Sequence, residues 1–335
     1  MGQNIIWEAE YNSALSNNAY SVIHSKLGGY LVGGSIATTT DGLDILILRV
    51  DSIGDTLWTK QLGGISDDEA FCVIEDANND ILVSGYTKSY GNGLSDFFIT
   101  KLNATGVVQW TQTSGGVLKD GSYSIIATLD GGYLTAGYTN SSGAGLKDFY
   151  LLKLSATGTF QWAKTYGGSG NDVACDVVQN QDSSIIIVGN TTSFGSSDLN
   201  PYIIKTNKNG DTLWTKVIYE TGIDIINSVS LVGKTGILLA GNKSITNRLN
   251  AQLIKLTATG HVIWQQEYDI TGDDEIKDCY QNENGAVYLV GSNSTPEGTS
   301  PLCIMTNDYG DLLTNKVFQS TKECLMGCML MRIIT

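Results

Sequence analysis

The chain has few prolines and almost no histidine. Only 3 of its 335 residues are proline and 2 are histidine, whereas 39 are glycine. This composition, with many Ser, Thr and Asn residues, is typical of a turn-rich all-β protein rather than a disordered one. The two histidines, His24 and His261, stand at unmatched positions, so a histidine-dependent triad or metal site has little material. Walker, dinucleotide-binding and G-x-S-x-G motifs are also missing.

Basic residues are scarce as well. The 20 Lys and Arg residues face 34 Asp and Glu residues, which gives a net charge of −14. Such an acidic surface should repel nucleic acid and anionic membrane, so we expect neither as a partner. The chain has no apolar run of about 18 residues, so we expect no membrane insertion. Residues 1–10 lack the basic start and apolar stretch of a signal peptide, but a mature domain behind an added Met1-Gly2 would look the same.

The cysteines give no clear sign of a disulfide framework or a metal site. Four of the six lie in strand-like segments of different repeats, where we expect them to act as small buried hydrophobes. Cys324 and Cys328 have a C-x-x-x-C spacing without a nearby His or second Cys pair, which is weak evidence for metal binding.

An internal repeat dominates the sequence. All six tryptophans recur at steps of 50 to 52 residues, at Trp7, Trp58, Trp110, Trp162, Trp214 and Trp264. A glycine stands four residues before each later tryptophan, at Gly54, Gly106, Gly158, Gly210 and Gly260, and Gly310 continues this series before Thr314. A further glycine series has the same period: Gly34, Gly85, Gly137, Gly189, Gly241 and Gly291. Three independent markers with one period exclude chance.

Each repeat shows two-residue alternation rather than helical spacing. In one copy the alternating segments are 70–74, 80–83, 96–102 and 107–110, with turn residues between them. These segments predict four strands, because successive side chains of a strand point to opposite faces. Four short antiparallel strands per unit of about 52 residues, repeated six times, indicate the blades of a β-propeller.

The predicted fold is therefore an all-β, single-domain β-propeller over residues 1–335. The repeats span residues 3–54, 55–106, 107–158, 159–210, 211–260 and 261–310, followed by a degenerate tail at 311–335. Small residues are needed near the axis, so we assign the innermost strands to the segments that begin at Ala19, Ala70, Ser122, Ala174, Ile226 and Ile276. The tryptophan strand is then outermost, and its ring should pack between neighbouring blades.

The sequence leaves two arrangements of the ring open. Residues 4–10 look like a tryptophan strand that closes the last blade, which predicts that the termini meet. Residues 311–318 resemble another outer strand and 321–335 an inner strand, but two strands of a seventh unit are missing. We favour six blades, with a seven-position ring and an incomplete last blade as the alternative.

The repeat resembles those of bacterial and archaeal surface propellers. Residues 130–139 match the pattern D-G-G-Y-x-x-A-G-Y-T, and residues 148–154 match D-F-x-L-x-K-L. The G-x-x-x-W ending is also similar to quinoprotein-type propeller repeats, although a distinct set of cofactor ligands is missing. The resemblance covers residues 3 to about 318 and implies a propeller at the cell surface or outside the cell. It says little about activity, because propellers host many unrelated functions.

A series of aspartates precedes the predicted inner strands at the blade period. Its members are Asp68, Asp120, Asp172, Asp224 and Asp274, with Asn17 at the first position. If the inner strands line the axis, these carboxylates encircle one mouth of the channel, where they could hold Ca²⁺ or a cationic ligand. Their regular period also fits a structural function, in which each carboxylate accepts hydrogen bonds from turn amides.

The loops between the second and third strands differ from copy to copy and should share a face with these aspartates. Tyr90 and Phe194 in these loops are candidates for stacking on sugar rings. A cation follows the first residue of the third strand by five positions, as in Lys101 and Lys153. This odd spacing puts it on the other face from Asp96 or Asp148, so we expect a solvated or interblade position for the cations.

These observations favour a non-catalytic binding or scaffold propeller that recognises a glycan, peptide or protein through its loop face. We expect no organic cofactor, with Ca²⁺ as the one candidate ion. The alternative is a hydrolase or lyase that acts on polysaccharide with rim carboxylates as acid and base. No carboxylate pair stands out from the periodic background for that chemistry.

Overall fold

Short alternating segments of apolar and polar residues form the strands of the computed structural model. The structure describes residues 11, 16–39, 42–195, 198–218, 224–233, 236–245, 248–318 and 331–332. These residues contain β-strands and turns, and no helix suited to crossing a membrane occurs among them. The predicted closing strand at residues 4–10 lies outside the described residues, as do Cys324 and Cys328.

The strands form six sheets, each made of four consecutive antiparallel strands. The strands of blades 1 to 3 are β1 (Asn17–His24), β2 (Tyr30–Ala37), β3 (Leu43–Val50), β4 (Thr56–Leu62), β5 (Asp68–Glu75), β6 (Ile81–Thr87), β7 (Asp96–Leu102), β8 (Val108–Ser114), β9 (Asp120–Ala127), β10 (Tyr133–Thr139), β11 (Asp148–Leu154) and β12 (Phe160–Tyr166). Those of blades 4 to 6 are β13 (Asp172–Gln179), β14 (Ile185–Thr191), β15 (Asn200–Thr206), β16 (Thr212–Val217), β17 (Asp224–Val232), β18 (Gly236–Ile245), β19 (Arg248–Leu256), β20 (Val262–Tyr268), β21 (Asp273–Gln281), β22 (Val287–Thr295), β23 (Gly298–Thr306) and β24 (Leu312–Val317). A short strand, β25 (Met331–Arg332), pairs in parallel with Val22 and Ile23 of β1.

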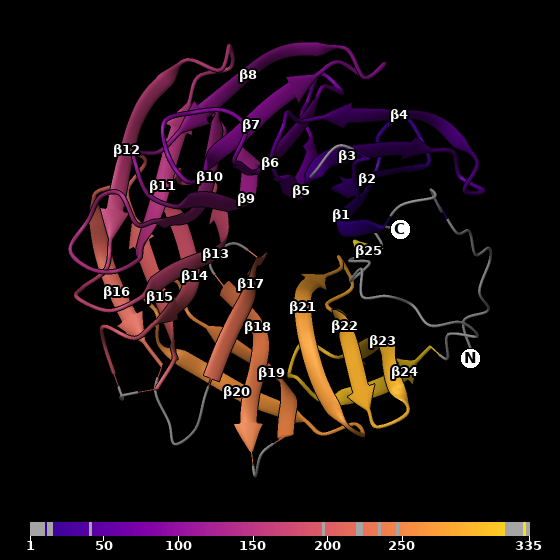
Figure 1. Cartoon of the computed structure of the whole chain (residues 1–335). Helices are drawn as coiled ribbons and strands as arrows, with labels where there is room; N and C mark the ends of the chain where they lie inside the picture. Colours follow the sequence, from indigo (N-terminus) through magenta and orange to yellow (C-terminus); the bar gives the residue numbers. More distant parts are fainter. Residues whose placement is uncertain are drawn as a thin grey trace.

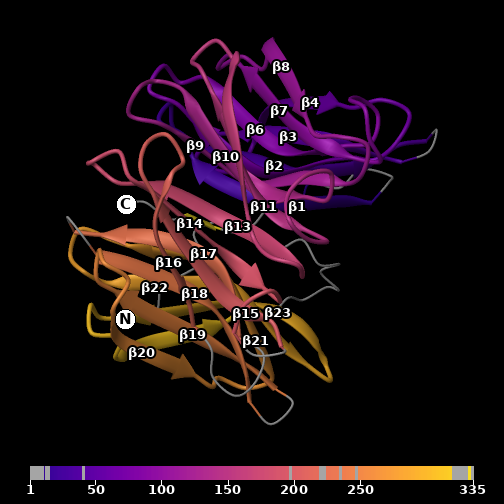
Figure 2. The ribbon, with the colours of Figure 1, turned by 90° about the vertical axis from the view of Figure 1, so that its left-hand side faces the viewer.

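The sheets are arranged around a common axis as a six-bladed β-propeller. The first strand of each blade lies nearest the centre of Figure 1 and the fourth lies at the outside. Figure 2, turned by 90°, looks onto the side of the ring where blades 3 and 4 meet. First strands of successive blades contact one another from β1 to β21. This arrangement confirms the predicted fold class and the assignment of the innermost strands.

Apolar side chains fill the space between neighbouring sheets. Between blades 1 and 2, the buried side chains of Leu31 and Ile47 pack in one cluster with Val83 and Phe98. Corresponding clusters lie between the later blades. Both faces of the middle strands of blades 2 to 5 are therefore covered, which explains their almost continuous apolar sequence.

The second glycine series marks the place where the first and second strands of a blade approach most closely. A Cβ atom on Gly85 would lie 1.8 Å from the carbonyl oxygen of Glu69. The strand register shifts at this place, between Ala70 and Cys72. A side chain cannot fit there, so the glycine is required in each blade by the bulge of the inner strand.

The first glycine series lies in the turn between the third and fourth strands. Gly158 has a φ of +78°, and a Cβ atom there would lie 2.6 Å from the Trp110 ring of the preceding blade. The five tryptophans that the structure describes therefore pack between neighbouring blades, as expected. In blade 5, the tyrosine four residues after the tryptophan adds a hydrogen bond, because the Tyr268 hydroxyl donates to the Gly310 carbonyl at 2.7 Å.

Tyr11 makes the same type of contact with blade 1. Its hydroxyl donates to the Gly54 carbonyl oxygen at 2.6 Å, as the Tyr166 hydroxyl does to Gly210 at 2.6 Å. Tyr11 also follows Trp7 by four residues, which is the spacing between Trp162 and Tyr166. Tyr11 therefore holds the position at which an outer strand ends elsewhere in the ring.

Candidate binding site at the central channel

The inner strands enclose a cavity of about 640 Å³ at the axis of the ring. All six blades contribute to its wall through the middle of β1, β5, β9, β13, β17 and β21, and blade 6 also contributes Gly291 and Ser292 of β22 and residues 299–301 of β23. The residues that face the cavity differ from blade to blade, whereas the residues that pack the sheets follow the repeat. Variable side chains on a fixed frame are typical of a recognition site.

Aromatic side chains cover the wall formed by blades 1 to 3. Tyr20, Phe71 and Tyr123 occupy equivalent positions on β1, β5 and β9. The Phe71 ring centre lies 5.0 Å from that of Tyr20 and 5.2 Å from that of Tyr123. Tyr86 and Tyr138 extend this wall, at 5.8 Å from Phe71 and Tyr123 respectively. These distances are those of interacting rings, so the five side chains form one aromatic wall.

Glu69 anchors the aromatic wall. Its carboxylate accepts hydrogen bonds from the Tyr20 hydroxyl at 2.8 Å and from the Tyr86 hydroxyl at 2.5 Å. Burial, followed by the hydrogen bond to Glu69, raises the pKa of Tyr20 to about 12, and the same causes raise the pKa of Tyr86. Both phenols are therefore protonated at neutral pH and donate to Glu69, which fixes the orientation of their rings.

Small polar and charged side chains cover the wall formed by blades 4 to 6. Cys175, Asn227 and Lys277 occupy the positions that Tyr20, Phe71 and Tyr123 hold in the other half. Burial, and then the charge of Asp176, raise the pKa of the Cys175 thiol to about 12, so this thiol is protonated at neutral pH. The Asn227 side chain donates to the Ile276 carbonyl at 2.6 Å, and Lys277 forms an ion pair with Glu275. The cavity therefore has one aromatic and one polar half.

A belt of polar contacts joins successive inner strands beside the cavity. Its members lie at the next position along each strand: Ser21, Cys72, Ser124, Asp176, Ser228 and Asp278. The Ser124 hydroxyl donates to Asp176 at 2.8 Å, and Asp176 accepts from the Val229 amide at 3.0 Å. The Val73 amide donates to the Ser21 hydroxyl at 3.2 Å. These contacts cross from blade to blade and hold the cavity wall in place.

The predicted rim aspartates lie at one end of the inner strands and are buried. Asp68, for example, accepts from the Gly64 amide at 2.9 Å and from the Ser89 hydroxyl at 2.7 Å. Equivalent contacts engage Asp120 with Gly116 and Ser141, Asp172 with Gly168 and Ser193, and Asp274 with the Ile270 amide. Asp224 is also buried. This geometry is that of a carboxylate that holds a turn, and ligand binding by these residues stays a prediction.

The same contacts show that the loops between the second and third strands lie on the face of the rim aspartates, because Ser89 is part of such a loop. Tyr90 and Phe194 also lie in these loops and are 49% and 38% exposed. The Tyr90 hydroxyl donates to the Gly63 carbonyl at 2.6 Å, and the Phe194 ring centre lies 5.2 Å from that of Tyr202. Both rings are partly engaged in loop packing, and their stacking on a ligand stays a prediction.

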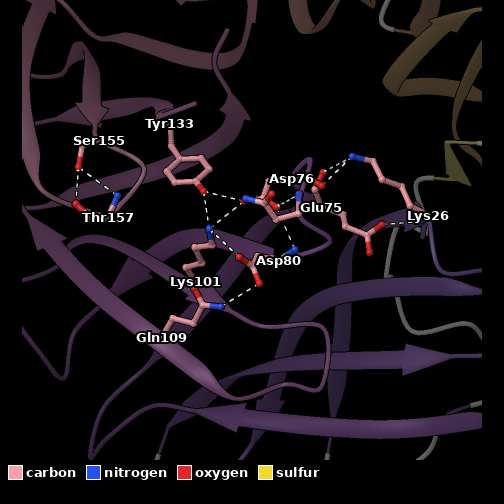
Figure 3. A network of polar contacts seen from close by, with 10 residues as sticks. Lys26, Glu75, Asp76, Asp80, Lys101, Gln109, Tyr133, Ser155 and Thr157 are labelled. Carbon is pink, nitrogen blue, oxygen red and sulfur yellow. Dashed lines mark hydrogen bonds and ion pairs between the residues drawn. The ribbon is translucent and has the colours of Figure 1, made fainter. Parts of the chain in front are cut away.

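The lysines of the third strands have a structural position that the sequence analysis only partly foresaw. Lys101 is 5% exposed, and its ammonium contacts Asp76 at 3.0 Å, Asp80 at 2.9 Å and the Tyr133 hydroxyl of the next blade at 2.9 Å (Figure 3). Lys153 is 3% exposed and contacts Asp130 at 2.9 Å. The interblade position is therefore right for Lys101, whereas a solvated position is wrong for both lysines.

Reactive groups for acid–base or metal chemistry are sparse among the described residues. The His24 ring packs edge-on against Tyr30, and His261 lies in an exposed turn beside Thr259. In the described part of the chain, no three His, Cys, Asp or Glu side chains come close enough together to hold a metal ion. Calcium binding at the rim stays a prediction.

No family model matches the chain. One curated relative is the regulatory protein FlaEY of Caulobacter vibrioides, which is 21% identical over 316 aligned residues. The match covers 74% of this chain and 32% of FlaEY, so the chain spans about a third of the length of that relative.

Solved structures of other propellers are similar in fold. Sqt1 of Chaetomium thermophilum, bound to the N-terminus of the ribosomal protein L10, has a TM-score of 0.50 and 9% identity, with 89% of this chain and 87% of that chain covered. A polysaccharide lyase of the PL25 ulvan lyase family, bound to a GlcA and sulfated-rhamnose saccharide, has a TM-score of 0.59 and 11% identity, with 91% and 86% covered. At such identities the likeness shows the β-propeller fold alone. Membership of the surface-propeller group stays a prediction.

Proposed function

We propose that this protein is a non-catalytic recognition propeller that binds a peptide segment of a partner protein at the central channel. The observation that carries the proposal is the cavity of about 640 Å³, with an aromatic half and a polar half built from the inner strands. Aromatic residues on a rigid frame provide large contact areas at little cost in conformational entropy, which is why they dominate many protein interfaces. An extracellular or cell-surface location goes with this proposal as an expectation.

The pairing of β25 with β1 supports the choice of a peptide. Met331 and Arg332 lie in parallel register with Val22 and Ile23, and both of these β1 residues line the cavity. The backbone of an inner strand is therefore able to pair with an extended segment at its axial edge. Addition of a strand to an open sheet edge is a common mode of peptide recognition. The fold likeness to Sqt1, which was solved with the N-terminus of the ribosomal protein L10 bound, supports a peptide as the ligand.

A polysaccharide-acting enzyme is the alternative function. The aromatic wall could also stack on sugar rings, and the fold is similar to that of an ulvan lyase. The rim carboxylates named for that chemistry, however, already accept hydrogen bonds from turn amides, as at Asp68, Asp120 and Asp172. Groups engaged in holding a turn are poorly suited to proton transfer, which favours binding over catalysis.

A peptide array tests the proposal, with binding to selected peptides then measured by fluorescence polarisation. Phe71→Ala removes the centre of the aromatic wall, and Phe160→Ala is the matched control, because Phe160 is 58% exposed on the outer strand β12. We expect Phe71→Ala to weaken binding roughly 30-fold, as the loss of an interface hot spot does, and Phe160→Ala to leave it unchanged. Thermal melts of both variants identify any loss of folding.

Two results would count against the proposal. An array without specific binders would remove peptide recognition. Release of reducing ends from a polysaccharide, abolished by one rim substitution such as Asp120→Asn in a folded variant, would replace binding with the enzyme alternative.

A further inference from the structure

Loops of blades 1 to 3 form a continuous surface on the face of the rim aspartates. We call residues 63–67, 88–95, 115–119 and 140–147 the loop crest. The Leu94 amide donates to the Leu118 carbonyl at 3.0 Å, and the Ser66 amide donates to the Ser89 hydroxyl at 3.1 Å. The Asn140 amide donates to the Lys119 carbonyl at 3.0 Å. Each segment of the crest therefore contacts the next, and the crest is a single surface.

Large apolar side chains of the loop crest point into solvent. The exposed fractions are 90% for Ile65, 59% for Leu94, 74% for Val117, 45% for Leu118 and 62% for Leu146. Single exposed apolar residues are ordinary, but an apolar patch on adjoining loops of one face is a feature of interaction sites. The crest is thus an apolar surface without a covering element among the described residues.

Two lysines without a carboxylate partner border this apolar surface. Lys119 and Lys147 directly follow Leu118 and Leu146, and neither forms an ion pair with any described residue. Burial, and then the positive charge of Lys119, lower the pKa of Lys147. The nearby Lys88, in contrast, is paired with Asp67 at 2.7 Å. In a chain with a net charge of −14, the crest therefore offers two uncompensated positive charges.

Lys147 also connects the crest to the aromatic wall of the channel. The Lys147 ammonium lies 4.2 Å from the centre of the Tyr138 ring, which is within the range of a cation–π interaction. The Tyr138 ring centre lies 5.8 Å from that of Tyr123, which lines the cavity. Contacts from Tyr123 through Tyr138 to Lys147 therefore join the cavity wall to the crest.

We infer that the loop crest binds an acidic peptide segment that also carries apolar side chains. The apolar residues of the segment pack on Leu94, Leu118 and Leu146, and its carboxylates pair with Lys119 and Lys147. Charge complementarity decides the partner, because a basic segment would meet two ammonium groups and an uncharged one would leave them unpaired. This inference rests on the proposed function and names the chemistry of its ligand.

The test is an array of peptides in matched sets, in which the same apolar residues alternate with Asp and Glu, with Ser and Asn, or with Lys and Arg. The variants are Lys119→Gln/Lys147→Gln and the control Lys164→Gln/Lys208→Gln, which changes the net charge equally. Lys164 is paired with Asp211, and Lys208 is exposed in the turn between β15 and β16. We expect the acidic set to bind, added salt to weaken it, and the crest variant to bind about tenfold more weakly than the control.

The outcomes separate this inference from the proposed function. If the neutral or basic set binds best, or if the crest variant binds as well as the control while Phe71→Ala weakens binding, the crest inference is wrong and channel recognition stands. If no peptide set binds, both fall. Binding of polyglucuronate in place of peptides, with the same dependence on Lys119 and Lys147, would also overturn the inference, because the ligand would be an acidic glycan.

Discussion

Gln252 is a buried amide at a position that is apolar or aromatic in the other five blades. It lies opposite Gly241 in β18, where the other blades have Leu46, Phe98, Tyr150, Tyr202 and Leu302 opposite the equivalent glycine. The Gln252 side chain is 1% exposed, and neither its oxygen nor its nitrogen has a hydrogen-bond partner among the described residues. We predict that Gln252→Leu stabilises the protein.

The magnitude follows from the desolvation of the amide. A buried amide without hydrogen bonds costs roughly 1–3 kcal/mol, and leucine fills a similar volume without that penalty. We therefore expect a gain of about 2 kcal/mol in the free energy of unfolding. With an unfolding entropy of roughly 2.1 cal/mol/K per residue, this gain raises Tm by about 3 °C for a chain of this length.

Differential scanning calorimetry measures this shift, with Gln161→Leu as the matched control. Gln161 is exposed on the outer strand β12, so its replacement should change stability by less than about 0.5 kcal/mol. An unchanged or lowered Tm for Gln252→Leu would refute the reasoning, because it would show that the amide is satisfied in the folded protein.

Three further predictions concern the frame of the ring. Lys101→Met leaves the buried Asp76 and the partly buried Asp80 without their cation and should destabilise by about 3 kcal/mol in urea unfolding. Lys164→Met, at an exposed ion pair, should cost less than about 0.5 kcal/mol, and equal losses would contradict the buried network. Gly158→Ala should destabilise by at least about 2 kcal/mol more than Gly131→Ala, because both glycines have a φ near +80° but only Gly158 faces a tryptophan ring. Similar losses of stability would show that the tryptophan ring moves aside for the added methyl group. Burial acts to raise the pKa of Asp130, but the hydrogen bonds from Thr128 and Lys153 outweigh it and lower this pKa from 3.8 to about 2. The Asp130 carboxylate therefore stabilises the fold above pH 4, and this stabilisation is lost as the pH falls toward 2. Tm measured over that range should fall less steeply for Asp130→Asn, and parallel curves would count against the lowered pKa.

The repeat was sufficient to predict the fold, and the reason is steric. The tryptophan and the turn glycine mark one contact between neighbouring blades, as Trp110 and Gly158 show, and the second glycine series marks the bulge of the inner strand. Features required in every blade appear in the sequence at the blade period. The strand order follows from them, whereas the structure decides for six blades over a seven-position ring.

The candidate site was harder to predict because its residues break the period. Tyr20, Phe71 and Tyr123 are aromatic in three blades, whereas Cys175 and Lys277 hold the same position in two others. The one available signal for the site was the two-residue alternation of the inner strand. Because Ala70 is buried, its neighbour Phe71 and the equivalent residues point to the other face of the strand. The periodic aspartates drew attention instead, although their regularity follows from the turns that they hold.

The partner of Lys101 was also beyond the sequence analysis. Strand geometry correctly separates Lys101 from Asp96, but Asp76 lies in the turn between β5 and β6 and reaches the lysine only through the pairing of three strands. Contacts between side chains on different strands depend on the register of the whole sheet, which the spacing within one strand does not contain.

Hydrogen–deuterium exchange, with and without the tightest array peptide, tests the central claim most directly. Recognition at the channel predicts slower exchange in the inner strands, above all β1, β5 and β9, and in the loops at 88–95 and 140–147. Slower exchange confined to the outer strands, such as β8 and β12, or to the turns on the opposite face would contradict binding at the channel.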